Sequence, residues 1–78
     1  MEEQIKLIWD FRGPSASLTA IHHQKHLEEF CVQENYSTIE AGYKDLSDMH
    51  STAYIIVPKE KMIIFRDALK PHRGEKIV

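Results

Sequence analysis

The sequence is short of cysteine, of excess positive charge and of long hydrophobic runs, and each shortage argues against a class of protein. Its single cysteine, Cys31, cannot form a disulfide within the chain, which argues against a small disulfide-stapled scaffold. Ten Lys and Arg against twelve Asp and Glu give a net charge of −2, the opposite of a basic nucleic-acid-binding surface. No stretch approaches the roughly 20 apolar residues that span a bilayer. We therefore expect no nucleic-acid partner and no membrane partner.

The 78 residues are enough for one domain, and no linker, internal repeat or low-complexity tract divides them. The chain starts with Met1-Glu2-Glu3, which is acidic and precedes only a short apolar run, so we expect no signal peptide. We predict a single domain over residues 1–78, soluble and cytoplasmic. Because a core of this size is often only marginally stable, dimerisation would be an ordinary remedy.

The longest helical pattern covers Ser15 to Asn35. At about 3.6 residues per turn, one face collects apolar side chains and one histidine: Ala16, Ala20, His23, Leu27, Phe30 and Cys31. Ser15 or Ser17 suits the N-cap position. Asn35 tolerates the left-handed backbone at which many helices end. The segment therefore predicts an amphipathic helix.

Three segments before and after this helix have strand patterns. Gln4 to Phe11 alternates apolar and polar residues, with Ile8 as an apolar residue on the polar side. Tyr36 to Tyr43 also alternates. Thr52 to Val57 is apolar on both sides, which is typical of a strand covered on both faces. Between these last two, Lys44 to Ser51 is interpreted as a polar loop too long for a tight hairpin.

The C-terminal third predicts a second helix and a short strand. Pro58 suits the first helical position, and Lys59 to Lys70 then places four apolar residues on one face: Met62, Phe65, Ala68 and Leu69. Pro71 ends the helix, and Glu75 to Val78 is the predicted last strand. The order strand, helix, strand, strand, helix, strand predicts an α+β, ferredoxin-like sandwich, with an antiparallel sheet and both helices on one face. The first and third strands are expected to be the central ones.

This layout leaves the second face of the sheet without helices. Ile8 and one side of Thr52 to Val57 are then expected to lie bare, and a bare apolar sheet face usually marks an interface. We therefore predict a homodimer formed through the sheet face, with Ile8 and either Tyr54 or Ile56 near a two-fold axis.

The layout, the length and the two-sided strand at Thr52 to Val57 resemble the dimeric α+β barrel superfamily, in which two ferredoxin-like units pack sheet against sheet. The resemblance covers most of the chain and is one of architecture. It implies a homodimer that is either a binding module or a small cofactor-free enzyme, since the superfamily includes monooxygenases, dehydratase-like enzymes and members without an established activity. No sequence motif names a reaction, so the resemblance assigns no catalytic residue.

The predicted topology gathers polar residues at one edge of the sheet: Asp10, Arg12, Ser15, Met49, His50, Lys70, His72 and Arg73. The helical residue His23 lies about two turns from the helix start and is near enough to reach the same region. Cationic and histidine side chains in such a rim can hold a small anion such as a carboxylate or phosphate. We predict Arg12, His23, His50, His72 and Arg73 as its ligands. The plainer interpretation, that a loop-rich edge simply collects polar residues, stays open.

Three histidines of the first helix are spaced for one side of it, with His22 and His26 at i, i+4 and His23 and His26 at i, i+3. Such a pair with a third ligand can hold zinc, copper or nickel, and a metal site is one alternative. The pattern lacks the glutamate of the HExxH motif, and exposed histidines are more often solvated, so we assign no metal and no cofactor.

An enzyme is the other alternative. His23 or His50 would then transfer a proton, because a histidine in a pocket titrates near neutral pH. Asp10 or Glu40 is placed to orient His23 in that reading. The catalytic residues stay unknown, and whether the chain is an enzyme is left open.

Overall fold

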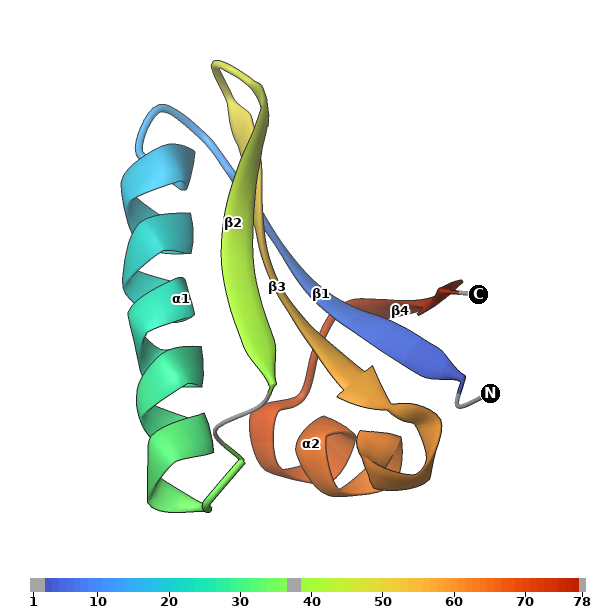
Figure 1. Cartoon of the computed structure of the whole chain (residues 1–78). Coiled ribbons are helices and arrows are strands. Elements are labelled where there is room, and N and C mark those ends of the chain that lie inside the picture. The colour runs from blue at the N-terminus through green and yellow to red at the C-terminus, as the bar shows by residue number, and fades with distance from the viewer. Residues whose placement is uncertain (1–2, 37–38, 78) are drawn as a thin grey trace.

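The structure is a computed structural model that describes residues 3–36 and 39–77. Within them an antiparallel four-stranded sheet has the order β2-β3-β1-β4, and two α-helices accompany it (Figure 1). In chain order the elements are β1 (Gln4–Arg12), α1 (Ala16–Gln33), β2 (Glu40–Ser47), β3 (His50–Pro58), the 3-10 turn η1 (Lys59–Lys61), α2 (Met62–Leu69) and β4 (Arg73–Ile77). This β-α-β-β-α-β layout is an α+β ferredoxin-like fold, which confirms the predicted fold class and the central places of β1 and β3.

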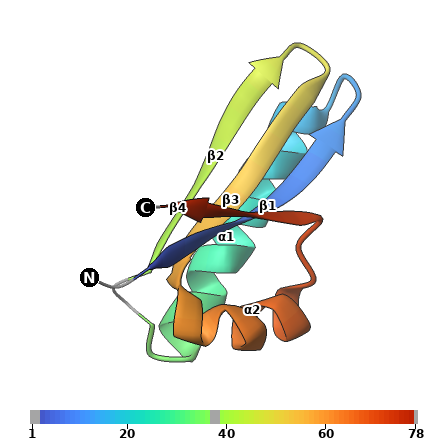
Figure 2. The same cartoon turned by 90° about the vertical axis from the view of Figure 1, so that its right-hand side faces the viewer.

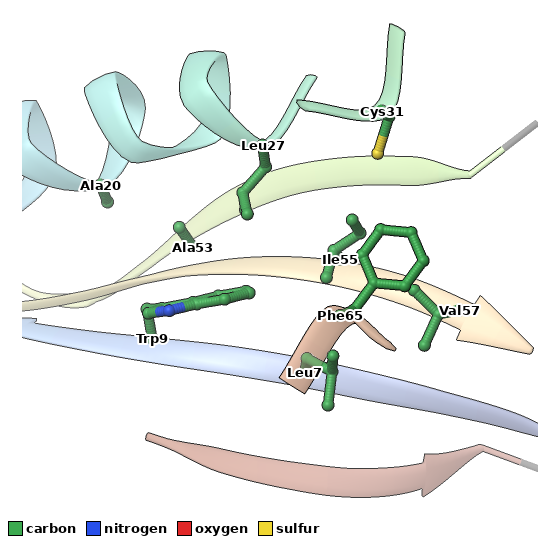
Figure 3. Close-up of a cluster of buried hydrophobic side chains, with 9 residues drawn as sticks. All are labelled: Leu7, Trp9, Ala20, Leu27, Cys31, Ala53, Ile55, Val57 and Phe65. Atoms are coloured by element: carbon green, nitrogen blue, oxygen red, sulfur yellow. The ribbon is translucent and has the colours of Figure 1, made fainter. Parts of the chain in front are cut away.

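Both helices contribute to a core on the same face of the sheet. α1 runs along the strands, whereas the shorter α2 lies across one end of them (Figures 1 and 2). Strand alternation turns every second residue toward the helices, and the buried cluster of Figure 3 is Leu7, Trp9, Ala20, Leu27, Cys31, Ala53, Ile55, Val57 and Phe65. The ring of Phe65 on α2 lies 5.6 Å from that of Phe30 and 5.0 Å from that of Tyr36, between centroids. The apolar stripe predicted for α1 is thus the side that packs.

The ends of α1 follow the sequence in part. Asn35 has a positive φ of 63°, as its left-handed tolerance predicts. Ser15 occupies the N-cap position, but its side chain makes no capping hydrogen bond. Its carbonyl instead accepts hydrogen bonds from the amide and the hydroxyl of Thr19, each 3.0 Å long. No helix in the described part of the chain is long and apolar enough to cross a membrane.

The predicted polar loop from Lys44 to Ser51 is wrong. β2 and β3 continue almost to each other and are joined by a turn at residues 48–49. The pairing shifts at Leu46, which forms a bulge, and Ser51 Oγ donates a 2.6 Å hydrogen bond to Asp45 across the hairpin. Polar residues can also form strands when their side chains hydrogen-bond to one another across the pair. The polar composition of this segment therefore misled the prediction.

Other boundaries move by a few residues. β2 begins at Glu40, and residues 37–38 of the predicted strand lie outside the described residues, as does Val78 at the chain end. Pro58 ends β3 instead of opening a helix, because the following amide, of Lys59, donates to the Glu3 carbonyl and extends the strand pairing. The 3-10 turn η1 follows from Lys59 and leads into α2 at Met62, so the predicted helix over Lys59 to Lys70 is confirmed with a 3-10 first turn.

The sheet face opposite the helices, here called the open face, is not bare at Ile8, and that expectation is wrong. Ile8 is only 3% exposed. It lies between Tyr54 on β3 and Arg73 on β4 in the strand register, and the side chains of its own face cover it. Tyr54 and Ile56 are half-buried on this face.

A stack of three residues from three strands covers part of the open face. The ring of Tyr54 lies over Gly42 so closely that a Cβ at Gly42 would stand 2.6 Å from Tyr54 Cζ. The Lys6 ammonium lies on the ring, 4.3 Å from its centroid. Glycine at position 42 is thus what allows the tyrosine ring to lie on the sheet.

Candidate functional site

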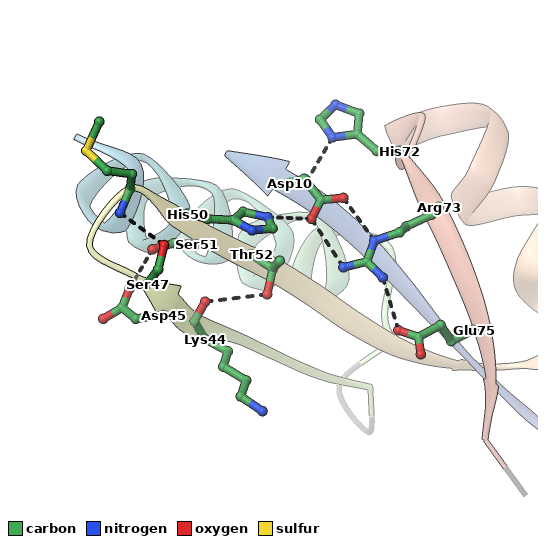
Figure 4. Close-up of polar contacts among 11 residues, drawn as sticks. Asp10, Lys44, Asp45, Ser47, His50, Ser51, Thr52, His72, Arg73 and Glu75 are labelled. Atoms are coloured by element: carbon green, nitrogen blue, oxygen red, sulfur yellow. Dashed lines mark hydrogen bonds and ion pairs between the residues drawn. The ribbon is translucent and has the colours of Figure 1, made fainter. Parts of the chain in front are cut away.

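Three strands bring polar side chains together at one end of the open face (Figure 4). Asp10 lies near the end of β1, His50 starts β3, Arg73 starts β4 and His72 precedes it. They meet because β1 ends where its two antiparallel neighbours begin. We call these four residues the Asp10 cluster, and it contains three of the predicted ligand-binding residues.

The Asp10 carboxylate holds the cluster together. Arg73 donates from Nε to Oδ2 at 2.9 Å and from Nη2 to Oδ1 at 3.2 Å, a bidentate geometry. His50 Nε2 lies 2.9 Å from the same Oδ1. His72 binds the main chain instead, because the Asp10 N–H donates to His72 Nδ1 at 2.9 Å.

These contacts determine the charge of the site. The hydrogen bonds from Arg73 lower the pKa of Asp10 to about 2, and the single hydrogen bond from His50 acts in the same direction, while burial opposes both. Asp10 in turn raises the pKa of Arg73. Both groups are therefore charged near neutral pH, and they neutralise each other.

Arg73, the arginine of the Asp10 cluster, already binds carboxylates of the protein itself. Arg73 Nη1 also lies 3.5 Å from the Glu75 carboxylate, so two internal acids share its guanidinium. Arg12, the other predicted cation, is exposed and lies beside His50 in the register of β1 and β3. The anion site stays a prediction. An incoming anion would have to compete with Asp10 for the guanidinium of Arg73.

His23 lies apart from the cluster, on the helix-covered face. Its ring packs 4.8 Å from Trp9 and 5.5 Å from Phe11, between centroids. Burial lowers the pKa of His23, and repulsion from His26 and His72 adds to the effect. Its Nε2 is buried and has no hydrogen-bond partner among the described residues.

The prediction that Asp10 or Glu40 orients His23 is therefore wrong. Asp10 binds His50 and Arg73 from the other side of β1, and Glu40 lies beside Ile56 on the open face. The surroundings of His23 favour a neutral aromatic ring that packs.

The other two histidines of the first helix, His22 and His26, are exposed. Across residues 3–36 and 39–77, no three His, Cys, Asp or Glu side chains are grouped so that they could hold a metal ion. Cys31 is buried as predicted, and burial together with Glu28 raises the pKa of its thiol. The thiol is thus held in its less reactive protonated form.

Two hollows of the surface lie away from the histidines. One of about 410 Å³ is lined by Glu3, Pro58, Lys59, Glu60 and Ile63. Another, of about 580 Å³, follows the outer side of α1 and is lined by Lys25, Glu28, Glu29, Val32 and Gln33. Neither is lined by His23 or His50, so neither offers a substrate position beside a candidate proton donor.

Sequence reasoning missed the stack of Tyr54 on Gly42 with Lys6 above it. The three residues are far apart in the chain and meet only through the strand register, which no local pattern encodes. Comparisons of the chain with protein-family models, with curated proteins and with solved structures found no match.

Proposed function

We propose that this chain is a non-catalytic interaction domain that forms a homodimer through the open face of its sheet. Both helices pack on the other face, so the open face is the broad surface left to a partner. The observation that carries the proposal is the order of charged residues around the apolar centre of this face.

The strand register arranges the open face in three rows. From β2 toward β4, the two outer rows are Glu40, Ile56, Lys6, Glu75 and Lys44, Thr52, Asp10. The middle row is Gly42, Tyr54, Ile8, Arg73. Glu40 and Lys44 on β2, like Lys6 and Asp10 on β1, therefore carry opposite charges at matching places on either side of a middle row that is apolar except for Arg73.

A two-fold axis along the middle row would exchange the two outer rows of facing copies. Glu40 would then face Lys44 of the second copy, and Lys6 would face its Asp10. An axis along the strands would instead bring Glu40 over Glu75, two like charges. In the first arrangement the middle row lies on the axis, so Arg73 would face Arg73 of the second copy, with its charge offset by Asp10 in each copy. Because a symmetric interface must be self-complementary, the charges of the outer rows favour this arrangement, with Ile8 and Tyr54 on the axis.

The dimer we propose is weak. Apolar burial contributes about 25 cal/mol per Å², and Ile8 is already covered within one copy, so Tyr54 and Ile56 supply most of the new area. Association entropy opposes this gain, and salt screens the charges at the rim. We therefore expect self-association at micromolar or higher concentration that weakens as salt is added.

Two further parts of the proposal rest on other residues. The resemblance to the dimeric α+β barrel superfamily is consistent with sheet-to-sheet packing, and a cytoplasmic location suits Cys31, which is buried and needs no disulfide. A small anion bound at Arg12 and the Asp10 cluster stays a separate prediction, which phosphate titration followed by NMR can test.

Charge exchange tests the dimer arrangement. Sedimentation velocity at low salt should show weaker self-association for Glu40→Lys and for Lys44→Glu than for the wild type, because each puts like charges face to face. The double variant Glu40→Lys/Lys44→Glu should recover it, since the pair is restored with reversed signs. Glu29→Lys, on the outer side of α1, changes net charge as Glu40→Lys does and should leave association unchanged. Single variants that associate like the wild type would contradict the arrangement.

A further inference from the structure

The pairing of β1 with β4 ends on a side chain. Regular pairing runs from Gln4 opposite Ile77 to Ile8 opposite Arg73. One step beyond, the His72 N–H donates to the Ile8 carbonyl at 2.9 Å. The next β1 amide that points to the same side is that of Asp10, and it donates to His72 Nδ1 at 2.9 Å. An imidazole nitrogen thus stands where a strand would offer a carbonyl.

We propose that His72 is a pH-sensitive latch that docks β4 onto β1. A ring nitrogen of histidine accepts a hydrogen bond only while it carries no proton, whereas both nitrogens of imidazolium are donors. Protonation would set the Nδ1–H of His72 against the N–H of Asp10, and the bond between them would be lost. The same residue supplies the backbone N–H that binds Ile8, so β4 would loosen at its first residue.

The neighbours of His72 act on its charge in both directions. The Asp10 carboxylate attracts an imidazolium, but it is already shared by Arg73 and His50. Other groups disfavour a positive charge on His72. They are Arg73 on β4, Lys70 in the connection before β4, and, when protonated, His50 on β3 and His23 on α1. On its apolar side the ring lies 6.3 Å from that of Phe11. A proton on Nδ1 therefore acts most directly by removing the hydrogen bond that Nδ1 accepts from the Asp10 N–H.

The latch is closed while His72 is neutral and opens when its ring takes up a proton. β4 has only five residues, four of which are exposed, so little apolar packing holds it in place. Arg73 would still be held by Asp10, so opening would free only the end of this edge of β1, at the Ile8 carbonyl and the Asp10 amide, which could then pair with another strand. This inference does not depend on the proposed dimer.

The test is NMR on the full chain labelled with ¹⁵N, with His72→Asn as the decisive variant. The side-chain oxygen of asparagine can take the place of Nδ1 as an acceptor and does not titrate. In the wild type we expect an unprotonated Nδ1 near pH 8. Exchange protection of the β4 amides should then fall by about tenfold near pH 5, as expected when one hydrogen bond opens locally. His72→Asn should keep the protection at both pH values, and His72→Ala should lack it at both.

His22→Asn is the matched control, because His22 is exposed on α1 and away from β4. In this variant the exchange protection of the β4 amides should depend on pH as it does in the wild type. Because His72 is exposed, its replacement leaves the core intact, and the amide spectrum of α1 reports that the fold is kept. A wild type whose Nδ1 carries the proton near pH 8, or a His72→Asn variant that loses β4 protection as the wild type does, would overturn the latch.

Discussion

The two faces of the sheet are covered in different ways. On the helix side, Leu7, Ile55 and Phe65 are almost completely inaccessible because separate elements pack over the strands. On the open face the strands cover themselves, since Tyr54 lies over Gly42 and the side chains around Ile8 bury it. Large neighbours on adjacent strands can therefore bury an apolar residue without a second layer.

The difference leads us to expect different roles for the two faces. The helix side is apolar and close-packed, so any loss there leaves a cavity. The open face is held by long, charged and half-exposed groups such as Lys6 and Arg73, which can be rearranged by a partner or a proton at little cost. Stability should therefore follow the first face and association the second.

The largest expected effect is on the helix side. Phe65→Ala should lower the free energy of unfolding by about 3–5 kcal/mol, because it removes a fully buried ring from the core. A domain of this size has little more than that to lose. Ile63→Ala on the same helix, where the side chain is 55% exposed, should change stability by less than about 0.5 kcal/mol. Urea unfolding followed by circular dichroism measures both, and equal losses would show that α2 does not anchor the core through Phe65.

A smaller effect, with a pH signature, is expected on the open face. The pKa of Asp10 is lowered from 3.8 to about 2 by folding, so its contribution is fully present above about pH 4 and lost as the pH falls toward 2. Asp10→Asn should cost about 1–2 kcal/mol near pH 7 and almost nothing near pH 2, the range allowing for partial exposure of the pair.

The control for this change is Asp67→Asn. The Asp67 carboxylate is 69% exposed and lies 3.5 Å from Arg66, a surface pair of the kind that contributes little. Thermal unfolding across this pH range gives both results. A loss for Asp10→Asn that is the same near pH 2 and near pH 7 would mean that the ion pair is not its cause.

Much of the fold could be predicted because apolar periodicity is local. The stripe on α1, the alternation in β1 and the two-sided β3 were enough to predict the element order and the central strands. The ends of β2 and β3 were not predictable in this way, because Asp45 and Ser51 are polar and satisfy each other only across the hairpin. The local sequence of either segment alone does not predict such pairing.

The site was predictable to the extent that topology determines it. The antiparallel order was enough to expect His50, His72 and Arg73 at one edge, and the structure brings them together around Asp10. Strand alternation already separates Asp10 from the α1 side, so His23 could have been kept apart from it. The cover over Ile8 depends on side-chain conformations, which residue types alone do not determine.

The most direct test of the account is the sedimentation of the full chain over a range of concentrations at low salt. We predict that the wild type shifts from monomer to dimer as concentration rises and shifts back as salt is added. Ile56→Asp, on the open face, should stay monomeric with a native circular dichroism spectrum, whereas Ile63→Asp on α2 should associate like the wild type. A folded wild type that sediments as a monomer at every concentration would contradict the claim that the open face is an interface.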